Sequence, residues 1–295
     1  MHIQTGNLLY LSYGQGLHEQ EVAFSLLSAW RWAEPGANEI RFLVYTDHPE
    51  SFAGLPVTIE LVPREQWDEW AGPFQFNHRR KIIALGHALQ KYSGATVLLD
   101  GDTWFRKSPR LLFGRVGPGH AVMHIREGRL TEIKMPIPLE MAGLLQRYRF
   151  TDSSGRVVEI PASSAIWNAG VVGMHPGDKG LLGEVLHLTD QMCAKSKLHI
   201  LEQFAFSYVL EQRMVQLTEA ADVVFHYWPP YLHEPFRLKL PRIMAEYASL
   251  PLAERAGRCY VERPRPTMSR RAKVIAKKGL QTLGLLRGGA RSNEW

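Results

Sequence analysis

Short apolar runs and helical periodicity alternate along the first part of the chain. Apolar runs predict strands over residues 7–13, 40–46 and 57–62, each closed by a glycine, aspartate or proline turn. Between the first two runs, Val22, Leu26 and Ala29 recur at the spacing of a helix. A strand, helix, strand, strand order is typical of an α/β domain, and we expect that fold class.

The clearest helical pattern covers residues 77–92. Its apolar stripe consists of Ile82, Leu85, Leu89 and Tyr92. Asn77 is a candidate N-cap, and Arg79, Arg80 and Lys81 crowd the first turn. Cations oppose the helix dipole there. Two explanations stay open, a phosphate-bearing ligand at this helix end or a solvated basic turn.

Two segments lack a clear period. Residues 64–76 contain four large aromatic residues, and we expect a loop that either folds over a bound ring or packs at the edge of the core. Residues 127–160 are rich in turn formers and are interpreted as an insertion that lines one side of a cleft.

A buried strand at residues 96–99 leads directly into two aspartates. The strand is apolar or β-branched throughout, as in a parallel sheet covered on both faces. Asp100 and Asp102 follow it, and Gly101 between them permits a tight backbone path. Carboxylate oxygens suit Mg²⁺ or Mn²⁺, and ligands collect at the carboxyl ends of such strands. We therefore expect a divalent metal site, with a plain polar turn as the alternative.

A later strand and helix add candidate ligand contacts. Over residues 165–176, Gly170 and Gly173 interrupt a strand pattern and indicate close approach of a ligand or another backbone. A helix is expected at residues 181–193, and another at 202–212 begins with Glu202-Gln203. This exposed carboxylate and amide suit sugar hydroxyls, and are equally ordinary in a first helical turn.

A last short strand is expected at residues 223–228. It contains His226 followed by two aromatic residues. A single histidine in such a strand is a metal ligand in some proteins and a structural residue in more of them.

Length and composition fit one large α/β domain with an appendage. The chain has 295 residues, of which 45% are hydrophobic and 22% charged. No run approaches the ~20 apolar residues of a membrane span, and the start lacks a signal-peptide pattern. We therefore expect a cytoplasmic protein. Cys193 and Cys259 are interpreted as ordinary thiols.

The net charge of +6 is concentrated near the C-terminus. From residue 263 onward the basic residues are Arg263, Arg265, Arg270, Arg271, Lys273, Lys277, Lys278, Arg287 and Arg291. Residues 268–286 can form a basic amphipathic helix, which either lies on the anionic inner face of a membrane, packs on the body or stays in solvent. We predict a main domain at residues 1–245 and a basic, partly helical extension at 246–295. No phosphate-loop or zinc-finger spacing supports nucleic-acid binding.

Together, this order of motifs resembles the GT-A glycosyltransferases, and most closely the family 8 type that includes glycogenin and bacterial lipopolysaccharide galactosyl- and glucosyltransferases. The resemblance covers residues 7–240 and is most specific over 91–105 and 167–174. It implies a single GT-A, Rossmann-like nucleotide-sugar-binding domain with a mixed central sheet. It also implies transfer of a hexose from a nucleotide-diphosphate sugar, a UDP-sugar, to a hydroxyl of a glycan, lipid-linked or protein acceptor, with retention.

The resemblance assigns roles to individual residues. The implied ligands of Mn²⁺ or Mg²⁺ are Asp100, Asp102 and His226. The implied catalytic residues are Asp102, Asn168 and Glu202, of which Asn168 would hold a hydroxyl of the donor sugar. Contacts to the nucleotide-sugar would come from Tyr13, Asp47, Lys81, Asp100, Gly170 and Gln203.

Other interpretations come from different classes of protein. Family 8 enzymes usually carry a glycine and Lys-Pro-Trp after the late histidine, whereas His226 is followed here by Tyr227-Trp228-Pro229-Pro230. One alternative is a catalytically inactive, glycosyltransferase-like binding protein at a membrane surface. Another is a phosphatase of the haloacid dehalogenase type, although that class places its Asp-x-Asp near the start of its core.

Overall fold

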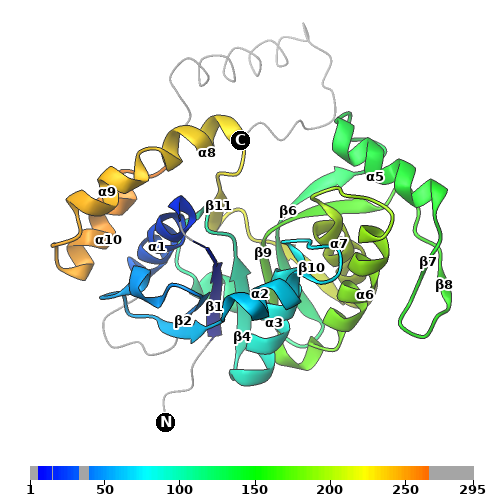
Figure 1. Cartoon of the computed structure of the whole chain (residues 1–295), viewed down its shortest axis with the longest axis horizontal. Helices are drawn as coiled ribbons and strands as arrows, with labels where there is room; N and C mark the ends of the chain where they lie inside the picture. The colour runs from blue at the N-terminus through cyan, green and yellow to red at the C-terminus, as the bar shows by residue number, and fades with distance from the viewer. Residues whose placement is uncertain (1–5, 15, 33–39, 266–295) are drawn as a thin grey trace, which may run out of the picture.

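A mixed seven-stranded sheet forms the centre of the protein in the computed structural model, which describes residues 6–14, 16–32 and 40–265 (Figure 1). The strand order is β10-β6-β9-β4-β1-β2-β3. The strands are β1 (Gly6–Ser12), β2 (Ile40–Thr46), β3 (Thr58–Leu61), β4 (Ala95–Leu99), β6 (His120–Arg129), β9 (Ala165–Met174) and β10 (Gln216–Glu219). Only β9 runs antiparallel to its neighbours in this sheet. The expected α/β class is confirmed.

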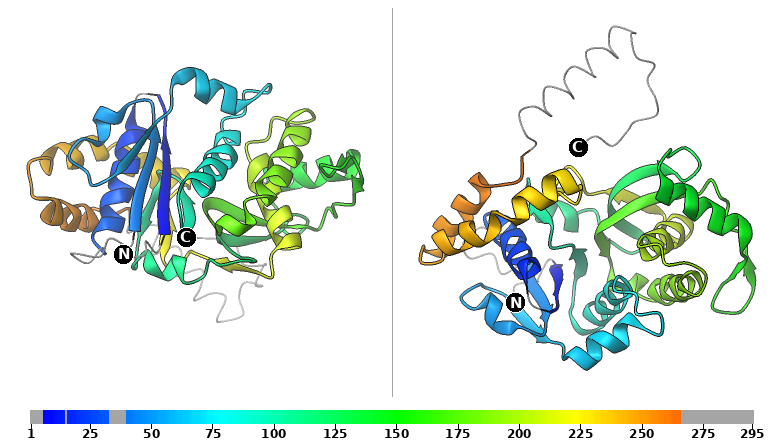
Figure 2. Two further views of the ribbon diagram at one scale, coloured as in Figure 1. Left: turned by 90° about the horizontal axis from the view of Figure 1, so that it is seen from below. Right: turned by 45° about the horizontal axis from the view of Figure 1, so that its top comes forward.

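Helices cover both faces of the sheet (Figures 1 and 2). They are α1 (Leu17–Trp30), α2 (Arg64–Ala71), α3 (Arg79–Lys91), α4 (Arg110–Phe113), α5 (Pro136–Arg147), α6 (Leu181–Cys193), α7 (Leu201–Arg213), α8 (Pro230–Arg237), α9 (Leu240–Glu246) and α10 (Leu252–Val261), with 3-10 turns at Pro49–Phe52 and Pro176–Asp178. Alternate strand residues point to opposite faces. Leu9 and Leu98 therefore pack in one core with α3, α6 and α7, while Leu8 and Val97 pack in the other with α1 and α8 to α10.

A small antiparallel pair extends the fold beyond the end of β4. It joins β5 (Thr103–Phe105) to β11 (Val224–His226), with His226 opposite Thr103. The backbone N–H of Tyr227 also donates to the carbonyl of Asp102 at 2.9 Å. This pairing carries a segment from late in the chain to the two aspartates that follow β4.

Regular structure lies in both segments that lacked a sequence period. Residues 64–76 contain α2, in which Trp67 and Ala71, one helical turn apart, are buried. Two buried residues are too few to give this stretch a helical period in the sequence. The prediction of a loop is therefore wrong where α2 lies. Residues 127–160 contain α5 and the hairpin β7 (Phe150–Thr151) with β8 (Val157–Val158), which reaches away from the body in Figure 1.

Three local predictions need correction. Asn77 is not the N-cap of α3, because the cap position is His78 and no side chain bonds there. Gly173 does not receive a ligand or a backbone. A Cβ on it would lie 2.5 Å from Val122 and 3.1 Å from Val97, so its smallness serves core packing. The edge strand β10 has no apolar run in the sequence and was not expected.

The C-terminal part of the described chain packs on the body. The predicted boundary between residues 245 and 246 falls at the end of α9, and α10 lies against α1. Arg31 of α1's C-cap lies 3.6 Å from the ring centroid of Tyr260. The predicted amphipathic helix at 268–286 lies outside the described residues. Within the described ranges, no helix has both the length and the apolar character needed to cross a membrane.

Candidate metal centre

Asp100, Asp102 and His226 converge at one edge of the sheet. One ligand atom from each lies within 4.8 Å of the others. Asp100 directly follows β4, and its backbone N–H donates to the carbonyl of Gly170 in β9 at 2.9 Å. Asp102 lies between β4 and β5, and β11 brings His226 to it. The structure therefore joins two residues of the β4–β5 connection and one of β11 into a group that is able to hold a metal ion.

Hydrogen bonds fix the orientation of His226. Its Nδ1 lies 2.8 Å from Oδ1 of Asn168, an oxygen that also accepts from the backbone N–H of Gly170 at 3.0 Å. Because that oxygen is an acceptor, Nδ1 carries the proton, and in the neutral ring Nε2 holds the free electron pair. Nε2 lies 3.1 Å from Asp102 and 3.9 Å from Asp100. This is the arrangement that second-shell partners impose on metal-bound histidines.

Electrostatics at His226 favour its charged form when no cation is present. Burial by itself would lower the pKa of the imidazole, but the adjacent carboxylate of Asp102 outweighs burial and raises it. The pKa of Asp102 shifts in the opposite direction. Burial would raise it, and His226 outweighs burial and lowers it. The pair thus neutralises itself in the buried site.

Gly170 makes room for His226. A Cβ on Gly170 would lie 2.2 Å from Nδ1 of His226. The close approach predicted for this glycine is present, but the group that approaches is the imidazole.

Lys81 links Asp100 to the buried Glu202. Its Nζ lies 2.6 Å from Oδ1 of Asp100 and 3.5 Å from Oε1 of Glu202. Glu202 is only 2% exposed. Its Oε1 atom makes no hydrogen bond, so the ion pair with Lys81 is the polar contact of that atom. Burial would lower the pKa of Lys81, but Asp100 and Glu202 raise it, so the ammonium stays charged. The expectation of an exposed carboxylate at Glu202 is wrong.

The other two cations at the start of α3 serve structure. Arg79 makes a bidentate pair with Asp190 of α6, at 2.7 and 3.0 Å. Arg80 donates to the carbonyl of Trp67 at 2.8 Å, and its guanidinium lies 4.4 Å from the ring centroid of Tyr13. At these two arginines, both explanations of the basic first turn fail, because neither side chain is solvated or free to bind a phosphate. Their partners lie on other elements, which the sequence alone does not reveal.

Glu127 is a site residue that the sequence did not indicate. It accepts from Nδ2 of Asn168 at 3.0 Å and from Nε2 of Gln203 at 3.2 Å, so it ties β9 to α7. Burial is the main cause of its raised pKa, which the bonds from Asn168 and Gln203 only partly offset. Its position follows from the pairing of β6 with β9, whose register shifts between Arg126 and Gly128. Such bulges redirect side chains beside functional sites.

His124 occupies a second register shift of β6, between Met123 and Ile125. Its ring lies edge-on to that of His226, with centroids 5.3 Å apart, and its Nε2 lies 3.3 Å from the carbonyl of Val224. Burial lowers the pKa of His124 to about 3, so the ring is neutral. In the sequence it stands inside an apolar run, which gives no signal of a site.

Tyr13 and Asp47 follow β1 and β2 at the same edge of the sheet. Asp47 accepts from the backbone N–H of Gly14 at 3.0 Å, and the ring of Tyr13 lies 5.0 Å from that of Trp67. Among the described residues, no hydrogen bond or ion pair joins either of them directly to the metal-ligand candidates.

Comparisons with protein-family models and with curated proteins found no match for this chain.

Proposed function

We propose that this protein is a metal-dependent glycosyltransferase that moves a hexose from a nucleotide-diphosphate sugar to an acceptor hydroxyl, with retention. The observation that carries the proposal is the convergence of Asp100, Asp102 and His226 beside β9. The reversed strand β9 interrupts the parallel order at this point, and open α/β sheets bind their ligands at the carboxyl ends of strands where the order changes.

The residues present fit a divalent cation. Two carboxylates and one imidazole form a mixed oxygen and nitrogen donor set, which suits Mn²⁺ and is also open to Mg²⁺. Asn168 fixes the ring of His226 so that Nε2 faces the carboxylates. A bound cation would supply Lewis-acid stabilisation of the charge that develops on the leaving diphosphate.

The neighbouring side chains suit a sugar at this edge. We assign the donor-sugar contacts to Asn168, Glu202 and Gln203, of which Asn168 and Gln203 share Glu127 and Glu202 is paired with Lys81. Lys81 keeps a positive charge next to Asp100. Tyr13 and Asp47, which follow β1 and β2 at the same edge, are the contacts we assign to the nucleotide.

The proposed transfer balances in atoms and charge. It needs no general base from the protein. The bond between the anomeric carbon and the phosphate oxygen breaks, and its electron pair leaves with the nucleoside diphosphate. The acceptor oxygen forms a bond to the same carbon on the same face, and its proton passes to the leaving phosphate. The residues around the site orient the sugar and exclude water.

Thermal unfolding with MnCl₂ or MgCl₂ and with UDP, GDP or CMP tests the proposal. A ligand that binds only the folded protein raises its melting temperature, so Mn²⁺ with one nucleotide is expected to stabilise the wild type. Asp102→Asn should abolish that shift. Asp68→Asn, at a carboxylate that is 58% exposed, is the matched control and should retain it.

Turnover separates the catalyst from the binding protein. Incubation with the matching nucleotide-sugar and Mn²⁺ should release the nucleoside diphosphate in the wild type and not in Asp102→Asn. A stabilised protein without turnover would instead support the inactive, glycosyltransferase-like binding protein. The absence of any nucleotide-dependent shift would contradict both.

A further inference from the structure

Of the three cations in the first turn of α3, only Lys81 contacts the candidate metal centre in the part of the chain that the structure describes. We propose that its ammonium competes with the metal ion for Asp100, and that Glu202 receives the ammonium when a divalent cation binds. Lys81 then sets how tightly the centre holds its cation. This inference rests on the metal dependence of the proposed function and names a regulation of that same site.

The ammonium of Lys81 contacts both carboxyl oxygens of Asp100. Nζ lies 2.6 Å from Oδ1 and 2.9 Å from Oδ2, and Oδ2 is also the oxygen that faces Nε2 of His226, at 3.9 Å. The side chains of Lys81 and Asp100 are only 15% and 22% exposed, so solvent screens their charges weakly. A cation that binds Asp100 must therefore displace Nζ from at least one of these oxygens.

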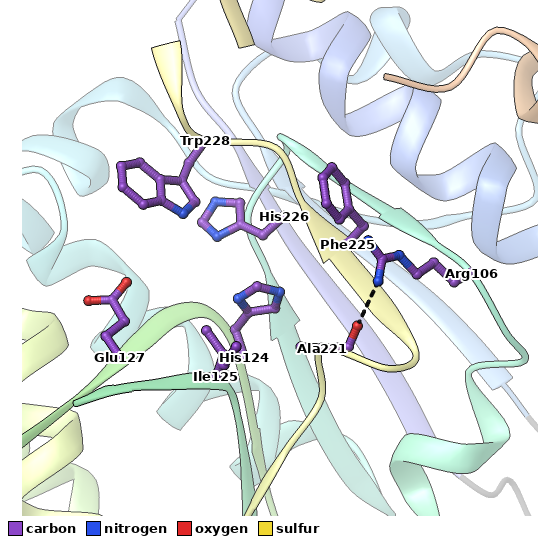
Figure 3. Close-up of a pocket in the computed structure, with 8 residues that line it drawn as sticks. All are labelled: Arg106, His124, Ile125, Glu127, Ala221, Phe225, His226 and Trp228. Atoms are coloured by element: carbon purple, nitrogen blue, oxygen red, sulfur yellow. Dashed lines mark hydrogen bonds between the residues drawn. The ribbon is translucent and has the colours of Figure 1, made fainter. Parts of the chain in front are cut away.

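Lys81 reaches the centre at Asp100 and not at the imidazole. His226 lines a small pocket together with His124, Glu127 and Trp228 (Figure 3). Lys81 is not among the residues that line this pocket. Displacement of the ammonium from Asp100 therefore requires no rearrangement of the side chains around His226.

Glu202 offers the ammonium a second partner close by. Its side chain is 3% exposed, and its Oε1 lies 3.5 Å from Nζ of Lys81 and makes no hydrogen bond. A movement of about 0.7 Å would bring the two atoms to the length of a charge-assisted hydrogen bond. Lys81 thus lies between a short contact to a candidate metal ligand and a longer contact to a carboxylate outside the metal-ligand group.

The places of the two residues on their helices agree with this exchange. Lys81 stands in the first turn of α3, where the helix dipole opposes a cation, so its carboxylate partners must stabilise it there. Glu202 stands in the first turn of α7, where the dipole favours an anion. When a metal ion engages Asp100, the contact with Glu202 keeps both buried charges compensated.

Isothermal titration with MnCl₂ alone measures this competition without nucleotide or turnover. Lys81→Met should bind Mn²⁺ about tenfold more tightly than the wild type, because Asp100 has lost its internal competitor. Glu202→Gln should bind Mn²⁺ about fivefold more weakly, because the displaced ammonium no longer meets a charged partner. In the Lys81→Met background, Glu202→Gln should change the affinity by less than about twofold, since no ammonium remains to be received.

Two neighbouring ion pairs supply matched controls. Lys91→Met removes a cation from the last turn of the same helix, and Asp190→Asn removes the carboxylate that pairs with Arg79. Both variants should bind Mn²⁺ as the wild type does. Thermal unfolding shows whether each variant folds. If Lys81→Met alone does not fold, the double variant should still bind Mn²⁺ at least about tenfold more tightly than Glu202→Gln.

Two outcomes would overturn the inference. One is weaker Mn²⁺ binding by Lys81→Met, which would make Lys81 a support of Asp100 and not its competitor. The other is an equal loss from Glu202→Gln in both backgrounds, which would reduce Glu202 to a through-space charge. Failure of the proposed function looks different, because Mn²⁺ alone would then bind with the expected order of affinities while no nucleotide shifts the melting temperature. Absence of Mn²⁺ binding in every variant would contradict both.

Discussion

The imidazole of His226 occupies the space that a side chain at position 170 would need. A Cβ on Gly170 would meet Nδ1 at 2.2 Å and Cε1 at 2.3 Å. Glycine at this point of β9 therefore decides whether the third candidate ligand is able to reach the aspartates. The interior of a protein is too closely packed for the ring to move aside freely.

Gly170→Ala is expected to displace His226 and to weaken Mn²⁺ binding by roughly 10- to 100-fold, as loss of a second-shell support does. Overpacking should also lower the free energy of unfolding by ~1–3 kcal/mol. Isothermal titration with MnCl₂ and urea unfolding measure the two effects. Gly183→Ala in α6, where a Cβ meets nothing within 4 Å, is the control and should not reduce Mn²⁺ affinity. Unchanged affinity in Gly170→Ala would contradict the role of His226.

Lys81→Met should destabilise the protein by ~3–5 kcal/mol, because it leaves Glu202 buried with an uncompensated charge. Adding Glu202→Gln removes that charge and should recover part of the loss. Urea unfolding of both single variants and the double variant measures the coupling. If the two losses simply add, the pair is not coupled.

Lys91 provides the matched control for that experiment. It pairs with Glu60 at 2.7 Å but is 48% exposed. Lys91→Met should therefore cost no more than ~1 kcal/mol, since solvent screens such pairs.

The pair between His233 and Glu21 should make stability depend on pH. Its atoms lie 2.6 Å apart, and the hydrogen bond that His233 donates to Glu21 raises the pKa of His233 by more than burial lowers it. A raised pKa in the folded state adds stability that is fully present below the unfolded value of about 6.5 and is lost as pH rises through the folded value.

His233→Gln should therefore destabilise the metal-free protein more at pH 5.5 than at pH 8.5, by ~1–2 kcal/mol. Urea unfolding at both pH values measures the difference. His48→Gln serves as the control, because the partner carboxylate of His48, Glu50, is 71% exposed. Equal losses for His233→Gln at the two pH values would show that the imidazole does not titrate with folding.

Tyr260 anchors α10 to the body. Arg31 lies 3.6 Å from its ring centroid and Arg263 lies 4.7 Å from it, while the ring of Trp104 packs edge-on at 5.6 Å. Tyr260→Ala should speed amide hydrogen exchange throughout α10, with a loss of ~0.5–1 kcal/mol for each cation–π contact, because Arg31 is exposed and Arg263 is half-buried. Tyr260→Phe keeps the ring and should exchange as the wild type does. Fast exchange in both variants would mean that the ring is not the anchor.

The local sequence pattern was sufficient to predict the strands and helices that contain many buried apolar residues. The predicted bounds of β2 and α6 agree with the structure, and the strand before Asp100 starts one residue earlier than expected. The grouping of Asp100, Asp102 and His226 followed from the resemblance, and the structure brings the three together.

Other parts of the site depend on pairing between distant segments. Glu127 and His124 reach the pocket because β6 shifts its register twice against β9, and neither shift has a signal in the local sequence. Arg79 finds its partner 111 residues later. In the sequence, Arg79 therefore looked available for a ligand, whereas in the structure it is already paired with Asp190.

The long interval between the candidate ligands has a consequence for synthesis of the protein. His226 follows Asp102 by 124 residues, and β9 must be inserted between β4 and β6 before the imidazole has a place to lie. A nascent chain that ends before β11 carries both carboxylates but lacks the third group. Under the proposed function, tight capture of a cation would therefore be acquired late, after the sheet is complete.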